Sequence, residues 1–86
     1  MTNHTLKTEE PYFTAVREHR KNFELRIDDR GYRIGDTVCL MQFIDGKVTG
    51  EFEEREITYI LRGFAGLNFG WCILSLKDVT IIGGIV

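Results

Sequence analysis

A lysine, a glutamate and an arginine lie close together in the sequence, at Lys21, Glu24 and Arg26. Glu24 and Arg26 are two residues apart in a segment that alternates apolar and charged side chains, so on a strand both point to the same face. A carboxylate beside a guanidinium and an ammonium offers an acceptor and several donors to a polar ligand, such as a base edge plus a phosphate. The same charges could instead form a structural ion-pair network opposite the core.

Other catalytic arrangements are not apparent in the sequence. Ser75 lies within an apolar segment and lacks the glycines of a nucleophile elbow. The glycine-rich segment 63–70 lacks the lysine and the following helix of a phosphate-binding loop. His4 and His19 have no cysteine or acidic partner at a metal-binding spacing, so we expect neither a metal nor a cofactor.

The composition is that of one small globular domain, residues 1–86. The chain is 43% hydrophobic and contains a single proline, which suits one compact core. It shows no membrane-spanning apolar stretch and no signal peptide, so we expect a cytoplasmic protein with Cys39 and Cys72 reduced and buried apart. A net charge of −2 argues against nucleic-acid binding by a broad basic surface, although Lys and Arg outnumber acids in residues 17–33.

The N-terminal part of the chain predicts one short helix. Thr8-Glu9-Glu10-Pro11 resembles a helix start, because Thr8 can cap free amides and Pro11 falls where an N–H has no partner. We expect the helix to end near Arg20 and to carry four residues at helical spacing, Tyr12, Ala15, Val16 and His19.

The remainder reads as strands, at residues 23–27, 38–44, 51–61, 71–76 and 79–82. Asp45-Gly46 predicts a hairpin turn, and a shift of apolar parity after Thr58 predicts a bulge. One helix with five or six short strands and no β–α alternation predicts an α+β, mainly β fold, a small β-barrel with one packed N-terminal helix.

The charged segment is similar to the G-x-K-x-x-E-x-R signature of ASCH domains, which belong to the PUA-like superfamily. It reads Arg20-Lys21-Asn22-Phe23-Glu24-Leu25-Arg26, with His19 where the family usually has glycine. The chain resembles a bacterial and phage subfamily of ASCH-like proteins through three further segments, 28–36, 57–64 and 71–76.

This resemblance implies a PUA-like barrel with a cleft beside the helix and a role in binding RNA or a nucleotide. Aromatic residues such as Tyr32, Phe64 and Trp71 are candidates for stacking on unpaired bases. Each could instead pack in the core, and core packing is the favoured interpretation for Trp71, which lies inside a predicted strand. The candidate nucleic-acid-binding residues are Lys21, Glu24, Arg26, Arg30, Tyr32 and Phe64.

Two alternatives remain open at this point. Some related ASCH proteins resemble small amidohydrolases acting on acylated cytidine with a catalytic lysine, threonine and glutamate. Lys21 matches that lysine, but the threonine position falls on Glu24 and no segment matches the one that supplies the glutamate. The other alternative is a protein-interaction domain in which the apolar tail 81–86 forms a dimer contact. The oligomeric state and the preference for RNA or DNA are undetermined by the sequence.

Overall fold

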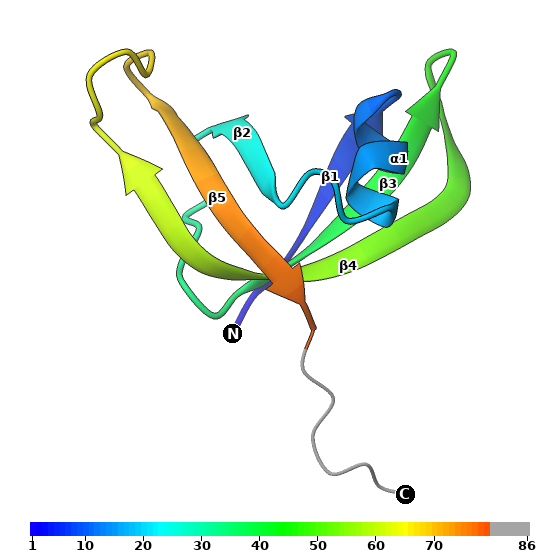
Figure 1. Cartoon of the computed structure of the whole chain (residues 1–86), viewed down its shortest axis with the longest axis horizontal. Coiled ribbons are helices and arrows are strands. Elements are labelled where there is room, and N and C mark those ends of the chain that lie inside the picture. The colour runs from blue at the N-terminus through cyan, green and yellow to red at the C-terminus, as the bar shows by residue number, and fades with distance from the viewer. Residues whose placement is uncertain (80–86) are drawn as a thin grey trace, which may run out of the picture.

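A computed structural model describes residues 1–79 of the chain. The protein is a small, mostly β domain with a five-stranded sheet and one short helix (Figure 1). The strand order is β1-β3-β4-β5-β2; β1 pairs with β3 in parallel and the other pairs are antiparallel. The elements are β1 (Asn3–Glu9), α1 (Tyr12–Arg17), β2 (Phe23–Ile27), β3 (Thr37–Ile44), β4 (Lys47–Arg62) and β5 (Trp71–Asp78).

The long strand β4 joins two halves of a bent sheet. Its residues 47–56 pair with β3, and its residues 55–62 pair with β5. Figure 1 shows the resulting V, with β1, β3 and α1 in one arm and β2 and β5 in the other. The register shifts between Ile57 and Tyr59, which confirms the bulge predicted at Thr58, and bulges bend the strand that carries them.

The sheet is open between its two edge strands, β1 and β2. Two arginine side chains span the opening: Arg26 donates to the carbonyl of Lys7 and Arg30 to that of Thr5, each at 2.9 Å. Within residues 1–79, therefore, the two edges are linked by guanidinium groups and not by strand pairing. The mainly β prediction is confirmed, whereas the sheet is not closed into the expected barrel.

The core fills the inside of the V. Burial of its apolar side chains, worth about 25 cal/mol per Å² of surface removed from water, holds the two arms together. Burial also raises the pKa of both thiols, Cys72 within the core and half-buried Cys39 on β3, and neither cysteine is in a disulfide. The core cluster consists of Leu6, Val16, Tyr32, Val38, Leu40, Ile57, Cys72, Leu74 and Leu76.

The first strand occupies a segment that the sequence predicted to be partly helical. His4, Leu6 and Thr8 point inward from β1, so Thr8 is a buried strand residue and does not cap the helix. Parallel pairing with β3 satisfies the backbone of this segment, whereas a short isolated helix is marginal in water. Two of these three inward residues are polar, so the segment lacks the alternation of apolar and polar residues that predicts a strand.

The helix is shorter than predicted and presents a different face. It has six residues and follows Pro11, which forms no side-chain cap. Phe13 and Val16 are its buried residues, whereas Tyr12 is exposed and His19 lies beyond its end. The residues of the helix that face inward are therefore Phe13 and Val16, three positions apart, and not the set that begins at Tyr12.

Strand β2 has the predicted bounds, but its faces are reversed. Glu24 is only 3% exposed, whereas Phe23, Leu25 and Ile27 are each about half exposed. The alternation was thus correct, and the charged face is the one turned toward the inside of the V. Of the last predicted strand, Val79 has no regular structure; the rest of 79–82, like the tail 81–86, lies outside the described residues.

A buried pair fixes the start of β1 to the turn before β3. His4 Nε2 lies 2.9 Å from Asp36 Oδ2, and the backbone N–H groups of Thr2 and Arg33 also donate to this carboxylate. Burial opposes ionisation of Asp36, but the hydrogen bonds outweigh it and hold the pKa of Asp36 below its ordinary value.

We expect Asp36→Asn to lower the free energy of unfolding at neutral pH by about 2–4 kcal/mol, because it weakens one buried and two partly buried hydrogen bonds. Since the folded-state pKa of Asp36 is depressed, the carboxylate stabilises the fold above its ordinary pKa of 3.8. That contribution is lost as pH falls through the folded-state value. Urea unfolding at neutral and acidic pH should show the two proteins converging in acid. A gap that stays constant with pH would contradict this account.

Candidate ligand-binding cleft

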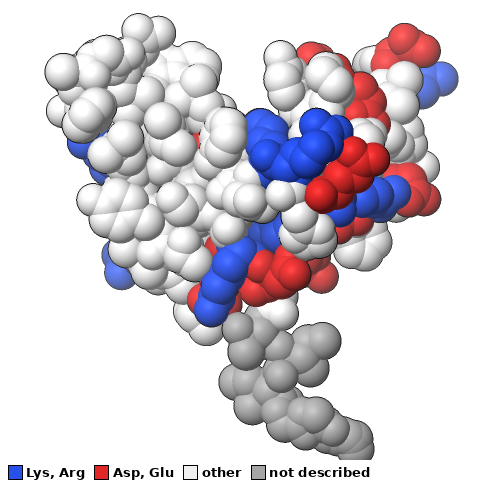
Figure 2. All heavy atoms as spheres, in the orientation of Figure 1, with Lys and Arg blue, Asp and Glu red and all other residues white. Residues whose placement is uncertain are grey.

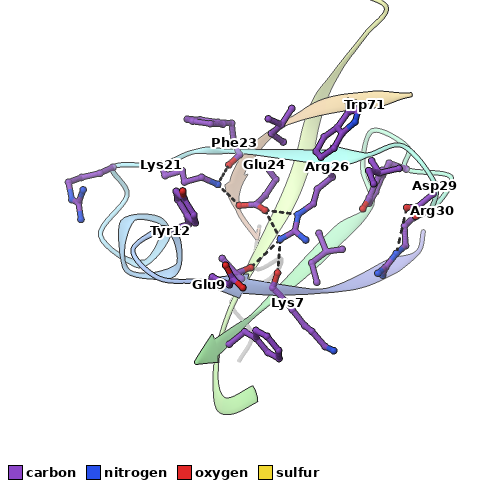
Figure 3. A pocket seen from close by; sticks show the side chains of 17 residues that line it. Lys7, Glu9, Tyr12, Lys21, Phe23, Glu24, Arg26, Asp29, Arg30 and Trp71 are labelled. Carbon is purple, nitrogen blue, oxygen red and sulfur yellow. Dashed lines mark hydrogen bonds and ion pairs between the residues drawn. The ribbon is translucent and has the colours of Figure 1, made fainter. Parts of the chain in front are cut away.

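A cleft of about 1110 Å³ opens between edge strands β1 and β2 and extends to α1 (Figure 3). Its lining contains five cationic residues, Lys7, Arg20, Lys21, Arg26 and Arg30, and three acidic ones, Glu9, Glu24 and Asp29. The lining therefore carries a net charge of about +2, although the whole chain carries −2. The aromatic residues of the lining are Tyr12, Phe23, Tyr32, Phe43 and Trp71.

Glu24 is the central charge of the cleft. Its Oε1 accepts a hydrogen bond from Lys21 Nζ, and its Oε2 accepts one from Arg26 Nε at 2.9 Å. Lys21 Nζ also donates to the Phe23 carbonyl at 2.7 Å. A carboxylate this deeply buried needs such partners, because an unpaired buried charge is strongly destabilising. The prediction that Glu24 and Arg26 share one face of a strand is confirmed.

Arg26 connects this cluster to the opposite wall of the cleft. Its Nη2 donates to the Lys7 carbonyl and lies 3.4 Å from Thr8 Oγ1, both on β1. The Lys7 and Thr5 carbonyls lie on the unpaired edge of β1, since alternate residues of this strand direct their backbone groups to β3. A guanidinium, with five donors in one plane, can serve Glu24 and β1 together.

The backbone beyond α1 sets the position of Lys21. His19 has a φ of 60°, in the left-handed region that favours glycine. The N–H groups of Arg20 and Lys21 both donate to the Ala15 carbonyl, which closes the helix end as a left-handed C-cap does. This turn ends α1, and β2 begins two residues after Lys21.

The aromatic candidates differ in how they meet the cleft. Tyr32 lines its floor but belongs to the core; its ring centroid lies 4.8 Å from that of His4, and burial raises the pKa of Tyr32. Trp71 lines the cleft from β5. Tyr12 lines it from α1, although the sequence predicted that this side chain would pack inward from the helix. Phe64 is exposed in the β4–β5 loop and does not line the cleft.

Two general features of residues 1–79 complete the description. In this part of the chain, no group of three or more His, Cys, Asp or Glu side chains is arranged to hold a metal ion. Its one helix is too short to traverse a lipid bilayer.

Comparison with known proteins identifies the family. A family model described as "Domain of unknown function (DUF3850)" matches residues 3–76, from the start of β1 into β5. The chain belongs to the DUF3850 family. A curated relative, the "Uncharacterized 12.9 kDa protein in GpA 3'region" of Escherichia phage P2, is 40% identical over 55 residues. These residues are 64% of this chain and 50% of the relative, so the DUF3850 chain spans about half the length of the curated protein it matches.

In this DUF3850 domain, Glu24→Gln should lower the free energy of unfolding by about 2–4 kcal/mol, because it leaves Lys21 and Arg26 without their shared counter-charge. The matched control is Glu54→Gln at an exposed site on β4, which should change stability by less than about 0.5 kcal/mol. Chemical denaturation of the three proteins measures both values. Equal stability of the Glu24 and Glu54 variants would show that the cluster does not support the fold.

Replacement of His19 tests the left-handed turn of the DUF3850 domain. His19→Gly should keep the free energy of unfolding within about 1 kcal/mol of wild type, because glycine adopts positive φ without strain and the exposed His19–Asp78 contact is worth little. His19→Val should cost about 1–2 kcal/mol relative to the glycine variant. Thermal melts of both variants check this, and a valine variant as stable as the glycine variant would rule out a strained turn.

Proposed function

We propose that this domain binds single-stranded RNA and holds one of its nucleotides in the cleft between β1 and β2. The observation that carries the proposal is a positively charged, aromatic-lined cleft in a chain of negative net charge. Recognition of single-stranded RNA commonly combines stacking of unpaired bases on aromatic side chains with donors to phosphate and base edges. A localised cleft suits one or a few nucleotides better than a long duplex.

The cationic side chains of the cleft keep part of their surface open to a ligand. The Arg30 side chain is about half exposed, and those of Lys21 and Arg26 are partly exposed. The five N–H groups of Arg26 outnumber its contacts with Glu24, Lys7 and Thr8. In the proposed complex, Tyr12 supplies a stacking surface, while Tyr32 supports the floor from the core.

The PUA-like barrel implied by the resemblance belongs to the same proposal. It is supported by a bent sheet whose edges face one another and are linked by Arg26 and Arg30. It is also supported by a cleft that lies beside the helix, where the resemblance places it. In this view the ligand occupies the seam of an incompletely closed barrel.

The amidohydrolase alternative has weaker support from the contacts in the cleft. Lys21 Nζ donates to a carboxylate and to a carbonyl, which are the contacts of an ammonium group, whereas a general base must present a free lone pair to the proton it removes. Glu24, at the position of the family's threonine, has both oxygens engaged by cations. Incubation with acylated cytidine, followed by chromatography of the products, tests the alternative directly.

The binding proposal is tested with a matched pair of arginines in the β2–β3 connection. Arg30 lines the cleft, whereas Arg33 is exposed and does not. Arg30→Ala should weaken binding of a short labelled single-stranded RNA by about 3–10-fold, the loss of one charge-assisted contact. Arg33→Ala should change it less than about 2-fold. With two or three cationic contacts, the log–log salt dependence should have a slope of roughly −1.5 to −2.

Fluorescence anisotropy titrations at several salt concentrations give these values, with circular dichroism to confirm folding. Equal losses for both arginine variants would indicate a diffuse charge effect and not a cleft. No saturable binding of RNA, DNA or nucleotides by the wild-type protein would contradict the proposal as a whole.

A further inference from the structure

The outside of one arm of the sheet carries apolar side chains in cross-strand rows. We call this surface the outer apolar face; it lies on β2, β5 and the end of β4, opposite the core. The strand register defines its three rows, which are Phe23–Ser75–Tyr59, Leu25–Ile73–Leu61 and Ile27–Trp71. None of these residues is a carboxylate, ammonium or guanidinium group. Figure 2 shows the same arm almost free of charged side chains on the side in view.

The first half of strand β5, residues 71–74, is apolar on both of its faces. Cys72, Leu74 and Leu76 point into the core, while Trp71 and Ile73 lie on the outer side and remain partly exposed. An antiparallel sheet with one solvated face normally alternates apolar and polar residues, whereas strands apolar on both faces are covered on both faces. Among the described residues, nothing covers the outer side.

The other arm of the sheet does not share this property. There the outward rows place charged and apolar residues together, as in Lys7–Met41–Phe52 and Thr5–Cys39–Glu54. The three uncharged rows are therefore specific to the β2–β5–β4 arm, where they end at the charged pair Glu56–Lys77. Large uncharged patches of this kind mark interaction sites on soluble proteins.

We propose that the outer apolar face is the interface of a homodimer, in which two copies pack sheet against sheet about a twofold axis. An uncharged face packs on its own copy without like-charge repulsion, whereas a charged partner would leave its own charges unpaired against it. Twisted sheets pack in this aligned manner in β-sandwiches. Glu24 and Arg26 point to the opposite face of β2 and stay accessible in the dimer. The boundary between the cleft and the interface is formed by residues that belong to both, Phe23, Leu25, Ile27 and Trp71.

The area of the face matches what a stable dimer requires. Each large side chain of the face that is about half exposed presents roughly 100 Å². The β4–β5 loop at the end of the same arm carries two further exposed side chains, Phe64 and Phe69. Together these residues expose roughly 600–900 Å², close to the 800 Å² or so that each partner buries in a standard interface.

Two exposed aromatic residues on β4, one in each arm of the sheet, provide a matched test. Tyr59 on the outer apolar face and Phe52 in the other arm are 57% and 53% exposed. Sedimentation equilibrium of the full chain should give a dimer of the wild type and of Phe52→Glu. Tyr59→Glu should raise the dimer dissociation constant by about 100-fold or more, because it places an unpaired carboxylate in the interface. Ile73→Glu, in the central row, should have the same effect, with circular dichroism to confirm that it folds.

A wild-type chain that sediments as a monomer up to submillimolar concentration would overturn the homodimer, whatever else covers the face. A dimer that persists in both Tyr59→Glu and folded Ile73→Glu would overturn the assigned interface. Neither result depends on RNA binding, because sedimentation is measured without RNA and neither Tyr59 nor Ile73 lines the cleft.

Discussion

The buried carboxylate of Glu24 is the charge on which the arrangement of the cleft depends. β2 turns it toward the inside of the V, where it is acceptable only if cations accompany it. Lys21 reaches it from the turn that ends α1, and Arg26 reaches it from two residues along the same strand. Because Arg26 also bonds to β1, the same carboxylate fixes the guanidinium that links the two edges of the sheet.

This arrangement explains why an open sheet has two protected edges. Unpaired strand edges attract other strands, and proteins blunt them with charged side chains. Here Arg26 and Arg30 occupy carbonyl groups on the free edge of β1, so that the seam between β1 and β2 is polar and cationic. The seam thus excludes a further strand while leaving donors for a small anionic or heterocyclic ligand. The outer side of β2 is apolar instead, as packing against the sheet of a second copy requires.

Much of the fold follows from local sequence patterns. The elements that were predicted incorrectly are those whose structure tertiary contacts decide. The bounds of β2, most of β3 and β5, and the bulge at Thr58 are local features. So is the hairpin at Asp45-Gly46, where both residues have positive φ, 51° and 77°, as a type I′ turn requires. Strand β1 was missed because two of its inward residues, His4 and Thr8, are polar and acquire their partners, Asp36 and Arg26, only in the folded chain.

The candidate site was predicted only in part, because tertiary contacts also decide which face of β2 is buried. The grouping of Lys21, Glu24 and Arg26 followed from strand periodicity, but the inversion of β2 did not, since an apolar stripe normally indicates the core. Tyr12 was placed inward because the helix start was set too early. Only the position of β1 shows that this ring faces the cleft.

The central claim is that a ligand enters the seam between β1 and β2 beside Glu24. An amide chemical-shift titration of the isotope-labelled protein with a nucleoside monophosphate, and then with a short single-stranded RNA, tests it most directly. The account predicts saturable shifts at Lys7, Lys21, Glu24 and Arg26, with the amides of Phe52 and Tyr59 unchanged. Shifts confined to the outer apolar face or the β4–β5 loop, or no shifts with either ligand, would contradict it.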